Sequence, residues 1–197
     1  QSARDFHDEA GNKITKIYLL TELAKRESES DIKRQEYLDS IEQNTNKLAS
    51  GMRDFIWSMD SVKDNLYDTA IRLQEFGESL FSLTDSLFSV SGLNTELQKI
   101  KVSMQMRRTL LLIFKEAMNN CAKYANAGDV NLSFAVQNNI LEIKLEDNGY
   151  GFDSKNSTTQ KGYGLNNMEQ RAKEINAELI IQSEKGEGTV VRIKCPV

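Results

Sequence analysis

Three glycine clusters follow one another in the second half of the chain, and each could bring backbone close to a ligand. They are 147–151 (DNGYG), 162–165 (GYGL) and 186–189 (GEGT). Glycine permits positive φ and close approach of backbone, but most such triplets are ordinary turns. One cluster alone therefore indicates little, whereas three in succession favour a set of loops around a binding site.

A polar face lies upstream of these clusters on an otherwise apolar helical segment. Glu116 and Asn120 are four residues apart and Lys123 is three further on, so the three side chains share one face of a helix over 104–125. The simpler reading is a solvated face. A helix that is apolar on its other sides is expected to pack on a sheet, however, which favours a functional patch opposite Asp147.

Several classes of function are excluded by composition. The net charge of −4 comes from interspersed signs, so no basic surface for nucleic acid is expected. Cys121 and Cys195 are isolated and only one histidine is present, which argues against a zinc site or a disulfide framework. No segment approaches the roughly 18 apolar residues of a membrane helix. Neither a G-x-x-x-x-G-K-[ST] phosphate loop nor a dinucleotide fingerprint occurs.

The N-terminal part, residues 1–62, is predicted to form a helical hairpin. Apolar or small residues recur in steps of three and four from Ala10 to Ala24, and again through three heptads from Leu38 to Met59. The polar stretch 27–31 separates the two helices. The second stripe predicts a homodimer in which two hairpins form a four-helix bundle, and the alternative is a hairpin packed on its own C-terminal domain.

Residues 63–197 are predicted to form an α/β sandwich with helices on one face of a mixed sheet. Helices are expected over 66–83, 104–125 and 165–175, and strands over 86–91, 178–183 and 189–194. Alternating residues on both sides of Asn138 and Asn139 predict a β-hairpin. The polar, glycine-rich stretch 148–164 is expected to be a mobile loop.

The segment 114–124 (FKEAMNNCAKY), followed by the Asp-x-Gly-x-Gly and Gly-x-Gly-Leu boxes, resembles the ATP-binding domain shared by gyrases, heat-shock chaperones, histidine kinases and mismatch-repair ATPases. The resemblance implies that ATP and Mg²⁺ bind here, that Asn120 binds the metal, that Glu116 polarises a water or metal ligand, and that Asp147 accepts from the adenine amino group. It further places Lys123 near the phosphates, Thr189 beside the base, and the remaining predicted nucleotide-binding residues around the triphosphate: Gly149, Gly151, Gly162, Gly164 and Leu165.

The stretch 7–11 (HDEAG) resembles the His-Asp-x-x-Gly phosphoacceptor box of the nitrate- and lipid-sensing histidine kinases. A lone histidine beside an apolar stripe is usually structural, but the combination with an ATP domain favours a phosphoacceptor. His7 lies seven residues before Ile14, at the margin of the helix seam, and is expected to be exposed. The resemblance implies autophosphorylation of His7 assisted by Asp8, and transfer to an aspartate of a response regulator.

Two positions depart from the pattern of the resembled subfamily. Asn12 stands where a Gln or His often positions water for dephosphorylation of the partner, and Tyr124 replaces the usual His after Lys123. Phosphatase activity and the hydrogen bonding around the phosphates are therefore left open.

The predicted function is that of a two-component sensor histidine kinase. The alternatives are a nucleotide-binding scaffold or pseudokinase without transfer, and a gyrase-like ATPase. The chain is expected to be the cytoplasmic fragment of an inner-membrane-anchored sensor, and to contact neither nucleic acid nor membrane itself.

Overall fold

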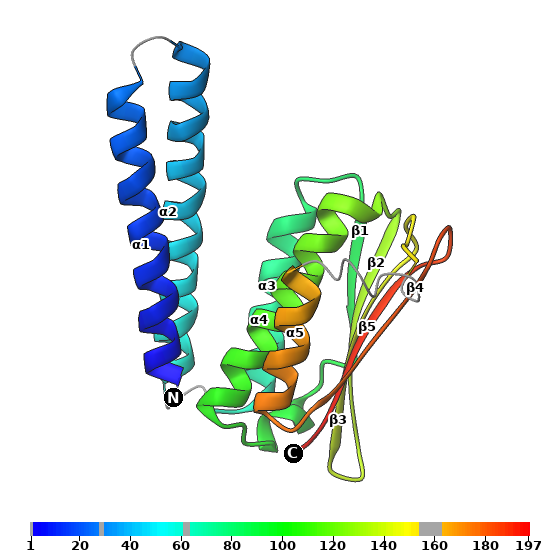
Figure 1. Cartoon of the computed structure of the whole chain (residues 1–197). Coiled ribbons are helices and arrows are strands. Elements are labelled where there is room, and N and C mark those ends of the chain that lie inside the picture. The colour runs from blue at the N-terminus through cyan, green and yellow to red at the C-terminus, as the bar shows by residue number, and fades with distance from the viewer. Residues whose placement is uncertain (1, 28–29, 61–63, 154–162) are drawn as a thin grey trace. The chain divides into compact units, whose positions relative to one another are not determined.

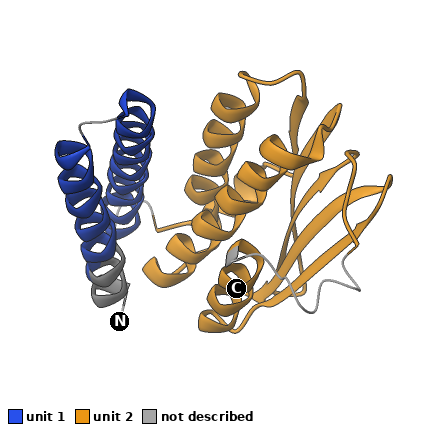
Figure 2. Cartoon of the chain, turned by 45° about the horizontal axis from the view of Figure 1, so that its top comes forward, with its two compact units in different colours: residues 1–60 blue, residues 61–197 orange. Residues whose placement is uncertain are grey.

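The computed structural model describes residues 2–27, 30–60, 64–153 and 163–197. Two compact units are present, residues 1–60 and 61–197 (Figure 2). The expected domain boundary at residues 62–63 lies outside the described residues.

The first unit is a hairpin of two helices, α1 (Ser2–Arg26) and α2 (Asp31–Met59), which run side by side (Figure 1). Ser30 caps α2 by accepting a hydrogen bond from the Lys33 backbone N–H at 3.3 Å. The helical hairpin expected from the sequence is confirmed. Within α2, Ile41, Leu48 and Phe55 are half-buried, whereas a second row spaced by seven stays exposed: Leu38, Thr45, Met52 and Met59.

The second unit contains a five-stranded sheet in the order β1-β2-β3-β5-β4. Only the β1–β2 pair is parallel, and the other pairs are antiparallel, so the sheet is mixed. The strands are β1 (Leu87–Ser91), β2 (Asp129–Gln137), β3 (Ile140–Asp147), β4 (Glu178–Glu184) and β5 (Gly188–Pro196). Asn138 and Asn139 both have positive φ and form the predicted tight turn between β2 and β3.

Three helices cover one face of this sheet (Figure 1): α3 (Leu66–Phe81), α4 (Met104–Asn120) and α5 (Tyr163–Glu174). Side chains from this face form the core. Phe114 and Met118 of α4 are fully buried, as are Leu132 of β2, Ile143 of β3 and Ile193 of β5. The predicted α/β sandwich with helices on one face is therefore confirmed.

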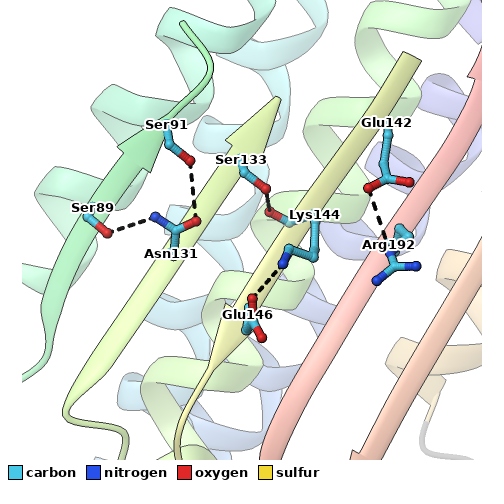
Figure 3. A network of polar contacts seen from close by, with 8 residues as sticks. All are labelled: Ser89, Ser91, Asn131, Ser133, Glu142, Lys144, Glu146 and Arg192. Carbon is cyan, nitrogen blue, oxygen red and sulfur yellow. Dashed lines mark hydrogen bonds and ion pairs between the residues drawn. The ribbon is translucent and has the colours of Figure 1, made fainter. Parts of the chain in front are cut away.

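The opposite face of the sheet carries polar side chains (Figure 3). Lys144 pairs with Glu146 at 2.6 Å, and the Arg192 side chain lies 3.9 Å from the Glu142 carboxylate. Strand residues alternate between faces, so this polar row is the counterpart of the buried row on the helix side. The alternation fixes the register that places Asp147 on the inner face.

Two local details differ from the expected elements. The helix predicted over 104–125 ends at Asn120, and a π-helical segment, η3 (Cys121–Ala125), follows it. A short 3₁₀ helix, η2 (Thr95–Lys99), precedes α4 and was not expected. The wider turn of η3 ends at Asn126 in the left-handed region, which redirects the chain into β2. The loop expected to be mobile falls largely on residues 154–162, outside the described part of the chain.

Among the described residues, no helix combines the length and the apolar character needed to cross a bilayer.

Gly92, which follows β1, is expected to be intolerant of a side chain. Its φ is +79°, and an added Cβ would lie 1.8 Å from the Phe134 carbonyl oxygen. The left-handed conformation costs a non-glycine residue about 1–2 kcal/mol and overpacking about 1–3 kcal/mol more, so Gly92→Ala should lose roughly 3 kcal/mol in urea unfolding.

Gly186→Ala is the matched control, since its φ is +85° but nothing lies within 4 Å of an added Cβ. It should lose only the conformational part, about 1–2 kcal/mol. Equal losses in the two variants would contradict the close approach of Gly92 to β2.

Candidate functional site

A cavity of about 410 Å³ lies in the second unit, between the helix layer and the sheet. Its walls come from α4, η3, β3, β4, β5, α5 and the loop after β3. The residues that line it are Glu116, Ala117, Asn120, Cys121, Tyr124, Ala125, Leu145, Asp147, Gly151, Phe152, Gly164, Leu165, Met168, Ile181, Thr189 and Val191. An apolar cleft of this size with a few convergent polar groups is typical of a small-ligand site.

Glu116 and Asn120 lie one turn apart on α4 and are both half-buried at the cavity wall. The first turn of α5 approaches them closely, because a Cβ added to Gly164 would be 2.4 Å from Glu116 Oε1 and 3.6 Å from Asn120 Nδ2. A side chain at position 164 would therefore displace the Glu116 carboxylate from its place at the cavity wall. The structure places Glu116, Asn120 and Gly164 at the same cavity.

Asp147 ends β3 on the inner face of the sheet and is only 7% exposed. Its Oδ1 accepts the Gly149 backbone N–H at 3.0 Å. Burial raises the pKa of Asp147, and hydrogen bonds from the backbone N–H groups of Gly149 and Thr189 and from the Cys121 thiol act in the opposite direction. A carboxylate held in this way can accept a hydrogen bond from a ligand amine and discriminate against a ligand carbonyl.

Cys121 lines the cavity beside this carboxylate. Burial, and next the charge of Asp147, raise the pKa of the Cys121 thiol to about 12. The thiol therefore stays protonated at neutral pH and acts as a donor rather than a nucleophile.

The loop after β3 is held on both sides by backbone hydrogen bonds. The Tyr150 N–H donates to the Ala125 carbonyl at 2.7 Å, and the Gly186 N–H donates to the Tyr150 carbonyl at 2.7 Å. Gly149 abuts Ala125, since an added Cβ would meet its carbonyl oxygen at 2.3 Å, and Gly151 has φ +55°. These contacts join the first and third glycine clusters around the same cavity.

The predicted site residues separate into several groups. The cavity lining includes Glu116, Asn120, Asp147, Gly151, Gly164, Leu165 and Thr189. Gly149 donates its backbone N–H to Asp147 but is not part of the lining. Lys123 is exposed on η3 outside the lining, and Gly162 falls outside the described residues.

The two predicted catalytic residues of the first unit both lie in α1. His7 is exposed there, as expected. The side chain of Asp8 is not among the described ones.

A magnesium ion would fit the donor set on α4. Among the described residues, no group of three or more His, Cys, Asp or Glu side chains could hold a metal. One carboxylate and one amide, Glu116 and Asn120, converge at the cavity wall instead. Mg²⁺ is often held by one or two protein oxygens together with phosphate oxygens and waters, so this sparse set suits a metal that arrives with a nucleotide.

Several lining residues were not anticipated from the sequence. Leu145, Ile181 and Val191 are inward-facing strand residues, and the alternation of the strands was the available signal. Ser183 was also missed, although its hydroxyl accepts the Phe152 backbone N–H at 2.8 Å. No sequence pattern distinguishes such a serine from one at an ordinary strand end.

Two family models match separate parts of the chain. Residues 2–64 match a model described as histidine kinase, and residues 106–197 match the histidine kinase-, DNA gyrase B-, and HSP90-like ATPase. Together the two models match a histidine kinase catalytic core. The resemblance stated from the sequence is thus confirmed: a helical region of histidine kinase type precedes a domain of the ATPase type.

Named relatives agree with this histidine kinase assignment. The sensor histidine kinase LiaS of Bacillus subtilis (strain 168) is 25% identical over 99% of this chain and 53% of its own length. The sensor protein VraS of Staphylococcus aureus (strain COL) is 25% identical over 99% of this chain and 54% of its own length. The chain thus spans about half the length of the curated relatives it matches.

Solved structures share the fold of this kinase core. The histidine kinase domain of the blue-light activated histidine kinase from Erythrobacter litoralis EL346 has a TM-score of 0.61 at 17% identity, covering 93% of this chain and 95% of that one. The Acinetobacter baumannii histidine kinase AdeS has a TM-score of 0.61 at 13% identity, covering 93% and 94%.

Gly164→Ala should weaken nucleotide binding without weakening the fold. The added Cβ would lie 2.4 Å from Glu116 Oε1, so the carboxylate must move from its place at the cavity wall. Alanine is at the same time about 1 kcal/mol more favourable than glycine inside a helix. We expect at least a tenfold lower affinity for Mg-ADP by titration calorimetry, with an unchanged or higher melting temperature.

Gly128→Ala serves as the control, because the nearest atoms to its added Cβ are 3.9 Å away. Retention of full Mg-ADP affinity by Gly164→Ala would contradict the placement of Glu116 and Asn120 at the binding site.

Proposed function

We propose that this chain binds Mg-ATP in the cavity of the second unit and transfers the γ-phosphoryl group to His7. The convergence of Glu116, Asn120 and Asp147 on one cavity is the observation that carries the proposal. The lone histidine on α1 supplies an acceptor, and the family assignment supports this pairing of a phosphoacceptor helix with an ATPase-type domain.

The base of ATP would lie at Asp147, which accepts from its amino group, with Thr189 adjacent on β5. Asn120 would contribute an amide oxygen to Mg²⁺, and Glu116 would polarise a water or metal ligand beside it. Bound Mg²⁺ offsets the charge of the phosphates. The glycines at 149, 151, 162 and 164, with Leu165, would surround the triphosphate, and Lys123 would approach it from η3.

Transfer would form a bond between an imidazole nitrogen of His7 and the γ-phosphorus while the bond from that phosphorus to the β–γ bridging oxygen breaks, releasing ADP. The attacking nitrogen must be unprotonated, and a carboxylate on the other ring nitrogen stabilises the imidazolium that develops. Asp8, the next residue in α1, is the proposed partner. The phosphoryl group would then pass from His7 to a response-regulator aspartate.

The hairpin is proposed to dimerise through the exposed row of α2. Met52 and Met59 remain 53% and 57% exposed in the single chain, and Leu38 is 47% exposed. Residues spaced by seven form one stripe along a helix, and an apolar stripe of this kind buries itself against a second copy. Two hairpins would then form a four-helix bundle, within a longer sensor protein that we propose to be anchored in a membrane.

Incubation with γ-labelled ATP and magnesium should label His7. The label should survive base and be lost in acid, as expected of a phosphoramidate. His7→Gln should abolish the label yet keep Mg-ADP affinity, whereas Asn120→Ala should lose both.

The other outcomes of this assay separate the alternatives. Label that persists in His7→Gln would contradict the assignment of His7. Nucleotide binding without label would indicate a scaffold or pseudokinase. Phosphate release that is unaffected by His7→Gln would indicate a gyrase-like ATPase.

Met52→Glu should convert the dimer into a monomer in sedimentation equilibrium, where the wild-type chain is expected at twice its mass of 22.3 kDa. Each dimer loses the burial of two Met side chains, which contributes roughly 1.5–3 kcal/mol apiece, and places two negative charges in the interface, where they repel each other. Gln43→Glu is the control on an exposed position of α2 outside the row, and it should stay dimeric. A monomeric wild type would contradict the proposed interface.

A further inference from the structure

Three polar side chains form a row across the inner face of the sheet. Asp147 of β3 is the register partner of Thr189 on β5, and Thr189 is the register partner of Ser183 on β4. Asp147 and Thr189 both line the cavity. Thr189 lies between Asp147 and Ser183 in this row. Ser183 can therefore affect the cavity through its contact with Thr189.

The Ser183 hydroxyl takes part in three hydrogen bonds with other described residues. It accepts the Phe152 backbone N–H at 2.8 Å and donates to the Gly188 carbonyl oxygen at 2.9 Å. Its oxygen is also 3.0 Å from Thr189 Oγ1. Ser183 therefore connects the loop after β3, the start of β5 and the hydroxyl of a cavity residue.

The chemistry of these partners fixes the direction of the Ser183–Thr189 bond. A serine hydroxyl has one hydrogen and two lone pairs. A carbonyl can only accept, so the Ser183 hydrogen is committed to Gly188. The Phe152 N–H occupies one lone pair, and the Thr189 hydroxyl must then donate to the other. Thr189 is left with acceptor lone pairs toward the cavity.

We propose that Ser183 is a positioning residue for nucleotide specificity, which orients the Thr189 hydroxyl so that it presents an acceptor, alongside the Asp147 carboxylate, to the base of the bound nucleotide. The inference rests on the proposed binding of ATP in this cavity. It assigns to Ser183 a role in base selection although Ser183 is not itself among the residues that line the cavity.

The consequence is that Asp147 and Thr189 both present acceptors to the base. Adenine presents an amino group at position 6, whereas hypoxanthine presents a carbonyl oxygen there. A carbonyl oxygen that faces Asp147 and an acceptor-oriented Thr189 receives no hydrogen from either residue, so the hydrogen bond made by the adenine amino group is lost. Without Ser183 the Thr189 hydroxyl can rotate and donate, so it would accommodate the carbonyl.

The test compares Mg-ADP with Mg-IDP by titration calorimetry in Ser183→Ala. We expect ADP affinity to fall about three- to tenfold, which is the effect of one hydrogen bond, and IDP affinity to fall less or to rise. The ratio of ADP affinity to IDP affinity, called here the ADP/IDP ratio, should therefore decrease. Ser183→Thr keeps the hydroxyl and should restore the ratio. A purely structural serine would lower both affinities alike and leave the ratio unchanged.

Two further variants isolate the route through Thr189. Thr189→Val should lower the ADP/IDP ratio as Ser183→Ala does. The double variant should lower it no further, because both single changes remove the same Ser183–Thr189 hydrogen bond. Ser133→Ala is the matched control: its hydroxyl lies on the polar outer face, 3.5 Å from the Lys144 carbonyl oxygen (Figure 3), and the ratio should not change.

The outcomes distinguish this inference from the proposed function. Absence of Mg-ADP binding by the wild type would overturn both. Selective wild-type binding with an unchanged ratio in a folded Ser183→Ala would overturn the role of Ser183 alone. If that variant fails to fold, Thr189→Val decides, and an unchanged ratio there likewise overturns the inference.

Discussion

The burial of one carboxylate, Asp147, constrains most of the second unit. A charged group removed from water must be satisfied by fixed donors, and here those donors are largely backbone N–H groups from Gly149 and Thr189. Both N–H groups are next to backbone that leaves no room for a side chain. Gly149 abuts Ala125, and a Cβ on Gly188, the residue before Thr189, would lie 1.9 Å from the Asp147 carbonyl oxygen. The glycine clusters thus position backbone around a buried acceptor.

The amphipathic pattern of helix α4 both packs the helix on the sheet and places polar side chains at the cavity. Its buried side chains, such as Phe114 and Met118, hold it on the sheet, and this packing is what presents Glu116 and Asn120 at the cavity wall. The change to a π-helical turn at Cys121 then brings Ala125 against Gly149. A regular helix through residue 125 would rotate these residues, so the local irregularity belongs to the geometry of the site.

The spacing of apolar residues along the sequence made the fold predictable, and residue type pointed to the polar residues of the candidate site. The heptads predicted the hairpin and the alternation predicted the strands. Glu116 and Asn120 were found because a carboxylate and an amide are unusual on an otherwise apolar helix, and Asp147 was found as the first residue of a glycine cluster. Ser183 and η3 were not predictable in the same way. Their positions depend on strand register and on contacts between segments distant in sequence, such as Phe152 with Ser183, which no local pattern encodes.

The proposed recognition of ATP and the proposed phosphoryl transfer impose opposite requirements on the two units. A group that selects a base must be buried, because water would otherwise satisfy a mismatched ligand, and Asp147 meets that requirement at 7% exposure. A group that receives a phosphoryl and hands it to another protein must be reachable by both, and His7 is exposed on α1. Placing the two groups on separately folded units lets each requirement be met without compromising the other. The proposed division between a binding domain with a buried selecting group and a helix with an accessible acceptor follows from that conflict.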